Sequence, residues 1–224
     1  MLDVLVARTA GPVAEMRELS RAGSIPVVNA MATEEHPTQG LCDLATIRLH
    51  FGALDGVRVL YLGEGNNTAT ALANGMAHVP GASVTFVTPA GFGLPADALA
   101  GARAAAAARG TSVTEVHSMT ELPEQVDVVY TTRWQTTGTT KRPGWRQAFR
   151  PFYVDAALMR RWPDAWFMHD LPAHRGDEVA GDVLDGPRSL AWLQARMKLT
   201  SAMAVLEALA PGPAGGVARA GGLR

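Results

Sequence analysis

The sequence has a single cysteine, no excess of charge of either sign and no long hydrophobic run. Cys42 alone cannot form an intramolecular disulfide, and paired-cysteine metal sites and redox motifs are excluded. The 20 Lys and Arg residues against 21 Asp and Glu create no field that would attract nucleic acid or an anionic membrane. No apolar run approaches the length of a membrane span, and the first residues lack the basic start of a signal peptide. We therefore expect a cytoplasmic protein that acts on a small molecule or another subunit, without nucleic-acid or membrane partners.

Short apolar runs alternate with helical patterns along the chain. Strands are expected at 4–6, 25–28, 57–62, 83–88, 112–116, 126–130 and 166–169, and helices at 13–21, 37–51, 68–78, 96–109 and 188–209. This alternation favours parallel sheets covered by helices, so we predict an α/β fold. The last residues, 210–224, lack the apolar content to pack and are predicted to be a disordered tail.

A glycine-containing turn at 63–68 follows one expected strand and precedes a helix. Backbone amides at such a helix N-terminus can receive an anion or the polar end of a ligand. A dinucleotide site would need a third glycine where Thr68 stands, and no acid follows the strand at 83–88 to hold a ribose. The pattern therefore disfavours a nucleotide-binding oxidoreductase or methyltransferase.

Two further polar motifs contain histidine. His36 and Gln39 open the helix expected at 37–51, where the positive pole of the helix favours groups that polarise a carbonyl oxygen. The alternative is a solvated cap in which His36 satisfies local backbone groups. His169 and Asp170 end the last expected strand, at the edge where α/β sheets bind ligands, although an ordinary turn has the same appearance.

Together these motifs resemble the aspartate/ornithine carbamoyltransferases over nearly all of residues 1–209. The segments that carry the resemblance are 3–9, 26–30, 36–44, 63–67 and 171–179, with Ser189 and the helix containing Gln194 and Ala195. The resemblance implies two parallel-sheet α/β subdomains, the first of them incomplete. It divides the chain into a remnant of the carbamoyl phosphate-binding domain (1–50), an amino-acid-binding domain (51–186), a C-terminal helix that packs back on the first domain (187–209) and the tail.

The family's reaction passes a carbamoyl group from carbamoyl phosphate to an amine without metal, cofactor or covalent intermediate. By matching position, the resemblance implies that the catalytic residues are Arg8, His36 and Gln39 and that carbamoyl phosphate is bound by Arg8, Thr9, His36, Gln39, Leu171 and Lys198. The amino acid would be bound by Asn66, Asn67, Thr132, Arg133, Gln135, Thr136, Thr137, Asp170 and Leu171. Preset donors suit this chemistry, because negative charge grows on the carbonyl oxygen and then on the leaving phosphate.

The chain departs from the family in its phosphate ligands. A Ser-x-Arg-Thr-Arg segment that normally grips the phosphate is absent from the sequence. Each lost charge-assisted bond costs about 1.5–3 kcal/mol, so we expect impaired activity from the chain as written. A mis-called start, a split gene with a separate N-terminal half and a degenerate relic are the explanations. The expected assembly is a homotrimer, or a complex with that separate half. Where the family has an arginine, this chain has Lys198, which keeps the positive charge but cannot bind phosphate through two parallel N–H groups as a guanidinium does.

At the positions implied to bind the acceptor amino acid, some residues resemble the ornithine branch of the family and others the aspartate branch. The 171–179 stretch and the turn at 63–67 look like the ornithine branch, which implies arginine biosynthesis. In that branch an acid stands where Thr132 is found and a cysteine where Asp170 is found, whereas Arg133 and Gln135 look like the aspartate branch. We hypothesise that Asp170 replaces the lost acid near the acceptor's amino group and that Arg133 meets a carboxylate; the alternative is that Asp170 faces solvent. An ornithine acceptor is favoured, with another amino acid or a non-catalytic homologue as alternatives.

Basic residues also gather in the stretch that follows the expected strand at 126–130. They are Lys141, Arg142, Arg146 and Arg150. They resemble the closing lid of the family, but a solvated face is the more ordinary interpretation of such a run.

Overall fold

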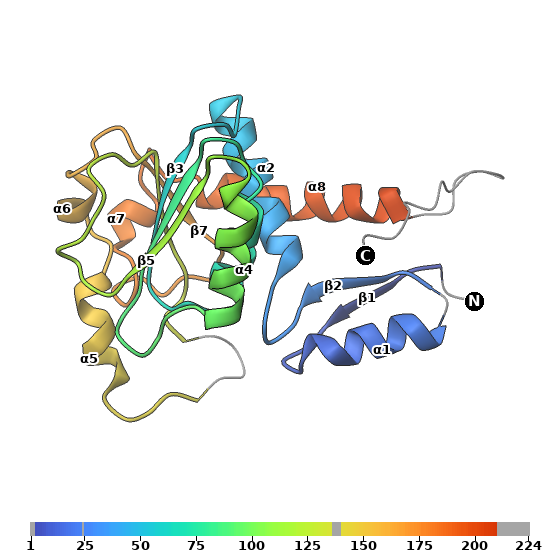
Figure 1. Ribbon diagram of the computed structural model, residues 1–224. Coiled ribbons are helices and arrows are strands. Elements are labelled where there is room, and N and C mark those ends of the chain that lie inside the picture. The colour runs from blue at the N-terminus through green and yellow to red at the C-terminus, as the bar shows by residue number, and fades with distance from the viewer. Residues whose placement is uncertain (1–2, 24, 136–139, 210–224) are drawn as a thin grey trace.

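Two parallel sheets of unequal size organise the protein, shown in Figure 1 as a computed structural model that describes residues 3–23, 25–135 and 140–209. The smaller sheet pairs β1 (Leu5–Arg8) with β2 (Val27–Met31), and α1 (Val13–Gly23) connects the two strands. We call β1, α1 and β2 the small unit. The expected strand at 25–28 in fact begins two residues later, after Pro26.

The larger sheet has five strands in the order β5-β4-β3-β6-β7. Its strands are β3 (Arg58–Leu62), β4 (Ser83–Val87), β5 (Ser112–Val116), β6 (Val128–Thr131) and β7 (Trp166–His169). All neighbouring pairs are parallel. The predicted α/β class is therefore confirmed, and this sheet with its helices is called the large unit.

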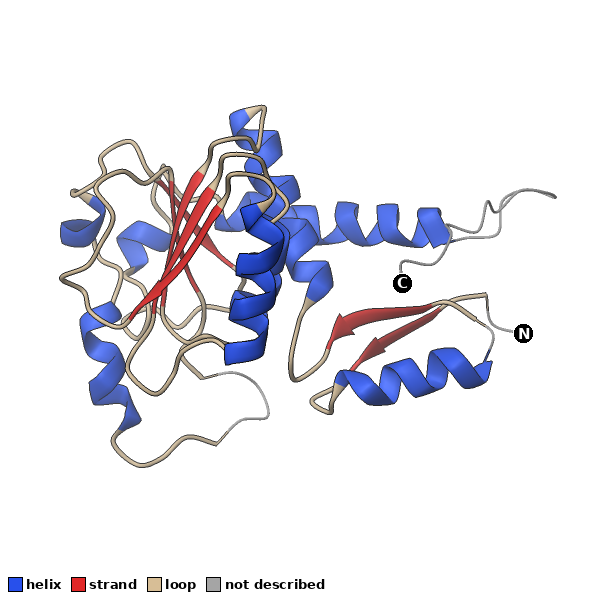
Figure 2. Ribbon diagram, in the orientation of Figure 1, coloured by secondary structure: helices blue, strands red, loops and turns tan. Residues whose placement is uncertain are grey.

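Helices cover both faces of the large sheet (Figure 2). Residues that alternate along each strand point to opposite faces, so Val59 and Tyr61 pack in one core with α2, α3 and α4, and Leu60 and Leu62 pack in the other. The first face carries α2 (Pro37–Phe51), α3 (Asn67–Met76) and α4 (Ala96–Ala107); the second carries α6 (Ala156–Met159) and α7 (Gly181–Leu184). The basic stretch that follows β6 contains α5 (Trp145–Phe149) and a 3-10 turn, Arg150–Phe152.

Two helices join the units. α2 begins at Pro37, whose fixed φ suits the first turn, and ends at Gly52, which adopts a φ of 79°. α8 (Ala191–Leu209) packs along α2 and then extends past the large sheet toward the small unit (Figure 1). None of the helices in the described part of the chain combines the length and hydropathy of a membrane span.

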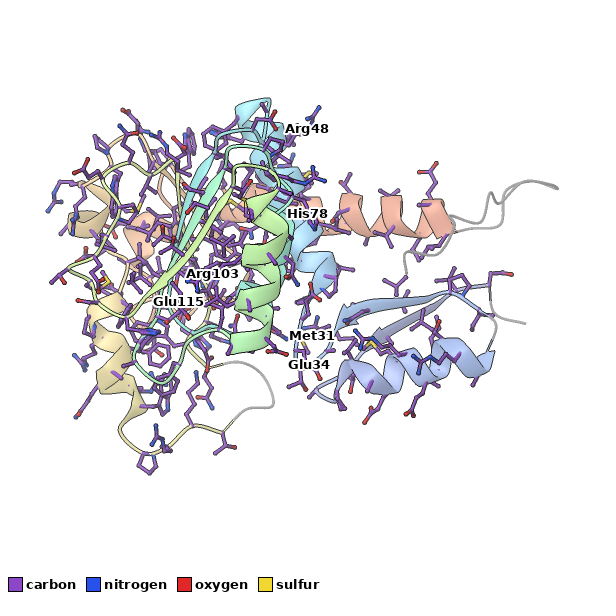
Figure 3. The ribbon with its side chains drawn as sticks, viewed as in Figure 1. Met31, Glu34, Arg48, His78, Arg103 and Glu115 are labelled. Carbon is purple, nitrogen blue, oxygen red and sulfur yellow. The ribbon has the colours of Figure 1, made fainter. Side chains whose placement is uncertain are left out.

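The direction of the strands places the functional loops together. Because β3, β6 and β7 are parallel neighbours, their C-terminal ends at Leu62, Thr131 and His169 lie at one edge of the sheet. The small unit stands beside this edge: Met31, at the end of β2, and Glu34, in the loop that follows, lie on the side that faces the large unit (Figure 3). The edge and the small unit thus enclose a site between them.

Candidate active site

A cavity of about 400 Å³ lies between the small unit, the strand ends of the large sheet and α8. Its lining includes ten of the residues that the sequence assigns to a site: Arg8, His36, Gln39, Asn66, Asn67, Thr132, Arg133, Asp170, Leu171 and Lys198. Thr9 and Gln135 do not line it, and Thr136 and Thr137 lie outside the described residues. The structure therefore brings together residues that are separated by up to 190 positions in the sequence.

His36 sits at the N-cap of α2 as a neutral imidazole. Arg8 Nη1 lies 3.2 Å from His36 Nε2, and because a guanidinium only donates, Nε2 is the acceptor. The proton is then on Nδ1, 3.3 Å from Thr38 Oγ1. Burial, followed by the charges of Arg8 and Lys198, lowers the pKa of His36 to about 4. Both ring nitrogens contact side chains, and the His36 side chain makes no capping hydrogen bond to α2, so the alternative of a cap that satisfies local backbone groups does not describe this residue.

Gln39 is buried and its amide is oriented by a carboxylate. Its Nε2 donates to Asp43 Oδ1 at 2.7 Å, which leaves Oε1 as the acceptor of this side chain. Asp43 is fully buried and also accepts from Gln194 Nε2 (2.6 Å) and the Tyr130 hydroxyl (3.2 Å). Desolvation raises the pKa of Asp43 to about 7, although these hydrogen bonds oppose the rise. An acceptor at Gln39 suits an amide-like N–H₂ group in the cavity.

Arg8 and Thr9 differ in whether their side chains are placed to bind an anion in the cavity. Arg8 is exposed at the end of β1, and its Nη1 also donates to the Ala30 carbonyl at 3.2 Å. The Thr9 hydroxyl accepts from the Gly11 N–H at 2.9 Å, within the turn before α1. Arg8 can therefore reach an anion in the cavity, whereas the role of Thr9 stays a prediction.

The turn at 63–68 is held by its own side chains. Asn66 Oδ1 accepts from the backbone N–H groups of Thr68 and Ala69, at 3.1 Å each, so these two amides are already satisfied. Gly65 is required by packing, because a Cβ there would lie 2.2 Å from the Leu94 nitrogen. The turn therefore presents the Asn66 and Thr68 side chains to the cavity, and its reception of an anion or of a ligand's polar end stays a prediction.

Thr132 is enclosed by neighbouring polar groups. The Tyr61 hydroxyl donates to the Glu64 carbonyl at 2.7 Å, so the Thr132 hydroxyl donates to the Tyr61 oxygen at 3.0 Å. Thr132 Oγ1 also accepts from Asn66 Nδ2 at 3.1 Å. This position therefore holds an engaged, uncharged hydroxyl.

Asp170 does not face solvent. Its side chain is 18% exposed, lines the cavity and accepts from Thr68 Oγ1 at 3.0 Å. The ammonium group of Lys198 contacts the Asp170 carbonyl oxygen from α8. Burial raises the pKa of Asp170, and electrostatic interactions with neighbouring groups, Lys198 among them, oppose the rise. The alternative of a solvated Asp170 is wrong, because the carboxylate is held inside the site.

Leu171 follows Asp170 in an unusual backbone conformation. It has a φ of 48° and is joined to Pro172 by a cis peptide bond. Its N–H donates to Nδ1 of the buried His169 at 2.8 Å. The other ring nitrogen, Nε2, lies 3.4 Å from Glu178 Oε1. The buried His169 therefore helps to hold the loop that contains Asp170 and Leu171 in place.

The basic stretch divides between a packed residue and a solvated face. The Lys141 side chain is only 4% exposed, lies 2.6 Å from Glu64 Oε2 and stacks over the Phe149 ring. Desolvation lowers the pKa of Lys141. Arg142, Arg146 and Arg150 are exposed. The interpretation as a solvated face is thus wrong for Lys141 and holds for the three arginines.

A group of potential metal ligands lies away from the cavity. His174, Asp177 and Glu178 place ligand atoms within 4.8 Å of one another. Asp177 is paired with Arg146 at 2.7 Å, and Glu178 accepts from the His174 backbone N–H. These groups already have protein partners, and they line no part of the cavity.

The structure adds residues to the site that were not assigned a role from the sequence. Asp43, Tyr130 and Gln194 form the network beneath Gln39, and Thr68 binds Asp170. Asp43 and Gln194 both stand in segments that carry the family resemblance, which was the available signal. Their meeting across 151 positions could not be predicted from spacing.

Two segments of the chain each match a domain of a known protein family. The carbamoyl-P binding domain of the aspartate/ornithine carbamoyltransferases matches residues 1–49, and the Asp/Orn binding domain matches 55–209. The ornithine carbamoyltransferase of Pyrococcus abyssi is 37% identical over 88% of this chain, and that of Bacillus subtilis 36% identical over 87%. The chain spans 63% and 61% of those relatives.

Solved structures extend the likeness to three dimensions. The ornithine carbamoyltransferase of Gloeobacter violaceus superposes with a TM-score of 0.85 at 36% identity, over 94% of this chain and 70% of that one. The Pyrococcus furiosus enzyme gives 0.87 at 35% identity, over 96% and 68%. The chain therefore belongs to the aspartate/ornithine carbamoyltransferase family.

Proposed function

We propose that this protein transfers the carbamoyl group of carbamoyl phosphate to the amino group of an amino acid, with ornithine as acceptor and citrulline as product. The observation that supports the proposal is the convergence of Arg8, His36 and Gln39 with Asn66 and Asp170 around one cavity. In this proposal residues 1–50 contribute to carbamoyl phosphate binding, 51–186 bind the acceptor and 187–209 join the two.

The chemistry that these groups support is electrostatic. In this proposal the Nδ1–H of the neutral His36, which lies 3.3 Å from Thr38 Oγ1 in the structure, turns to bind the carbonyl oxygen, and Gln39 Oε1 accepts from the carbamoyl N–H₂. Arg8 and Lys198 supply positive charge for the phosphate. Negative charge grows on the carbonyl oxygen as the amine attacks and then passes to the leaving phosphate, so donors held in place lower the barrier.

The remaining phosphate ligands belong, in this proposal, to a further polypeptide segment or subunit. Apolar side chains outside the cavity lining are exposed on α8, where such a partner would pack: Leu199 and Met203 are 66% and 60% exposed. Exposed apolar residues that gather on elements beside a site are a mark of an interaction surface. A trimer and a complex with a separate N-terminal half both fit this surface.

The proposal is tested by following phosphate release and citrulline formation from carbamoyl phosphate and ornithine. The chain is assayed alone and with the separately produced carbamoyl phosphate-binding half of a relative. We expect ornithine-dependent transfer with the added half, and a loss of about a hundredfold in His36→Ala, since a lost donor to the developing oxyanion costs about 10²–10³. Absence of transfer by the folded mixture to any amino acid would contradict the proposal.

An acceptor with a side-chain carboxylate is the second candidate. It is favoured by Arg133, which lines the cavity beside the uncharged Thr132. Replacing ornithine by aspartate in the same assay separates the two, because an aspartate enzyme would form carbamoyl aspartate and leave ornithine unreacted.

A further inference from the structure

The charges that line the cavity are unevenly distributed. Among the described lining residues, Arg8, Arg133 and Lys198 are cationic, and Asp170 is the one carboxylate. Carbamoyl phosphate and the acceptor's carboxylate are both anionic, so the cations suit them. An ammonium group on the acceptor has a single acidic partner in this set.

Asp170 is placed to act on such a group. Thr68 Oγ1 binds one of its oxygens, Oδ2, at 3.0 Å and fixes the carboxylate, whose other oxygen is Oδ1. Thr132, which also lines the cavity, donates its hydroxyl hydrogen bond to Tyr61 and accepts one from Asn66. A hydroxyl without charge binds ammonium weakly compared with a carboxylate. Asp170 is therefore the position at which a cationic amine is recognised.

We propose that Asp170 binds the reacting ammonium group of the acceptor and takes its proton before attack. This inference rests on the proposed carbamoyl transfer and adds to it a specificity-determining and catalytic residue. The acceptor class is an amino acid with a protonated primary amine on its side chain.

The ammonium gives one proton to the Asp170 carboxylate, and the neutral amine forms a C–N bond with the carbonyl carbon of carbamoyl phosphate. The C–O bond to phosphate breaks, and its electron pair leaves with the phosphate. The second proton on the new C–N nitrogen passes to that phosphate, and Asp170 later returns its own proton to solvent.

The surroundings suit a carboxylate that exchanges a proton. Burial raises its pKa, which makes it a better base than an exposed aspartate. The charged and titratable groups that act on it come from every element packed around it: Asp43 and Cys42 on α2, Tyr61 on β3, Tyr130 on β6, Arg133 after β6, His169 on β7 and Lys198 on α8. An ammonium group that binds here meets a base whose basicity the site has increased.

Binding measurements on the full chain test the recognition step without requiring turnover. Isothermal titration calorimetry at pH 8, with inorganic phosphate present, compares ornithine with norvaline, which has the same carbon chain but no side-chain amine. We expect ornithine to bind at least tenfold more tightly, and Asp170→Asn to lose about tenfold to hundredfold for ornithine and little for norvaline. Asp182→Asn, an equal charge change at an exposed site on α7, is the matched control.

The outcomes separate this inference from the proposed function. Equal ornithine affinity in wild type and Asp170→Asn, or equal affinity of wild type for ornithine and norvaline, overturns the inference and leaves carbamoyl transfer standing. Failure of folded wild type to bind any amino acid contradicts both.

The proton step has its own readout in the transfer assay with the added half. We expect kcat of Asp170→Asn to be strongly reduced and to keep rising with pH as solvent deprotonates the amine, whereas the wild-type kcat reaches its plateau at lower pH. Asp170→Glu should recover part of the rate. Identical pH profiles for wild type and Asp170→Asn contradict proton transfer to Asp170.

Discussion

The small and large units bury their residues to very different extents. In the large sheet Leu60, Phe86 and Phe167 are wholly buried, because helices cover both faces. In the small sheet no residue of β1 is buried, and Met16 is the one buried residue of α1. A sheet gains most of its stability from covered apolar faces, so the large unit supplies the rigid wall of the cavity and the small unit the weaker one.

In the proposed reaction, the two units bind different substrates. Asn66, Thr132 and Asp170 stand at strand or helix ends of the large unit, whereas Arg8 projects from β1. The acceptor side of the cavity is therefore held in place by a packed core. The phosphate side depends on elements with little buried surface of their own.

The largest effect expected from this comparison is on core stability. Phe86→Ala should reduce the free energy of unfolding by about 3–5 kcal/mol, because it removes a wholly buried ring and leaves a cavity. Val6→Ala, at a side chain that is 52% exposed, should change it by about 0.5 kcal/mol or less. Urea unfolding of both variants measures the contrast. Similar losses would show that the small unit is as well packed as the large one.

The next effect is the pH dependence of the free energy of unfolding, to which His36, between the units, and Asp43, inside the large unit, contribute with opposite signs. The folded pKa of His36 is about 4, below its usual 6.5, so the unfolded chain binds the proton first and stability falls as pH decreases from 6.5 to 4. The pKa of Asp43 is raised to about 7, so its contribution has the opposite sign: stability falls as pH rises from 4 to 7. At most, the full shifts correspond to roughly 3 kcal/mol for His36 and roughly 4 kcal/mol for Asp43.

Single variants separate these two opposite contributions to the change of stability with pH. His36→Gln should remove the acid-side loss, so that the stability of the variant decreases with rising pH over 4–6.5 more than that of wild type. Asp43→Asn should do the reverse. Unfolding curves at pH 4.5, 5.5 and 6.5 measure both, and unchanged slopes in both variants would contradict the charge states assigned to these residues.

The smallest effect tests the turn at the acceptor wall. Asn66→Ala removes the side-chain oxygen that caps two N–H groups of α3 and should cost about 1 kcal/mol. Asn66→Ser keeps a capping oxygen and should recover most of this stability while losing the amide that reaches Thr132. Thermal unfolding measures the loss. Equal stability of the alanine variant would show that the cap is dispensable.

Much of the fold could be predicted from the sequence because its signals are local. Alternating apolar runs predicted the five strands of the large sheet and their parallel direction, and Pro37 and Gly52 marked the ends of α2. The short helices α6 and α7 have four residues each, too few for a periodic pattern to identify them.

The site was predicted less completely because its partners are distant in the chain. The sequence pointed to His36, Gln39 and Asp170, but it contained no signal that Asp43 would meet Gln194 or that Thr68 would hold Asp170. Lys141 was misinterpreted for the same reason. Its aromatic and acidic neighbours come together only in the folded chain.

The most direct test of the account is a map of where ornithine binds, because the central claim is that the cavity between the two units is the substrate site. Titration of isotope-labelled protein, followed by the backbone amide signals in ¹H–¹⁵N NMR spectra, gives that map. We expect the signals of Asn66, Thr132, Asp170 and Leu171 to shift together, with little change at Val183 and Gly186 on the far side of the large sheet. Shifts confined to the far side, or none in the folded protein, would contradict the claim.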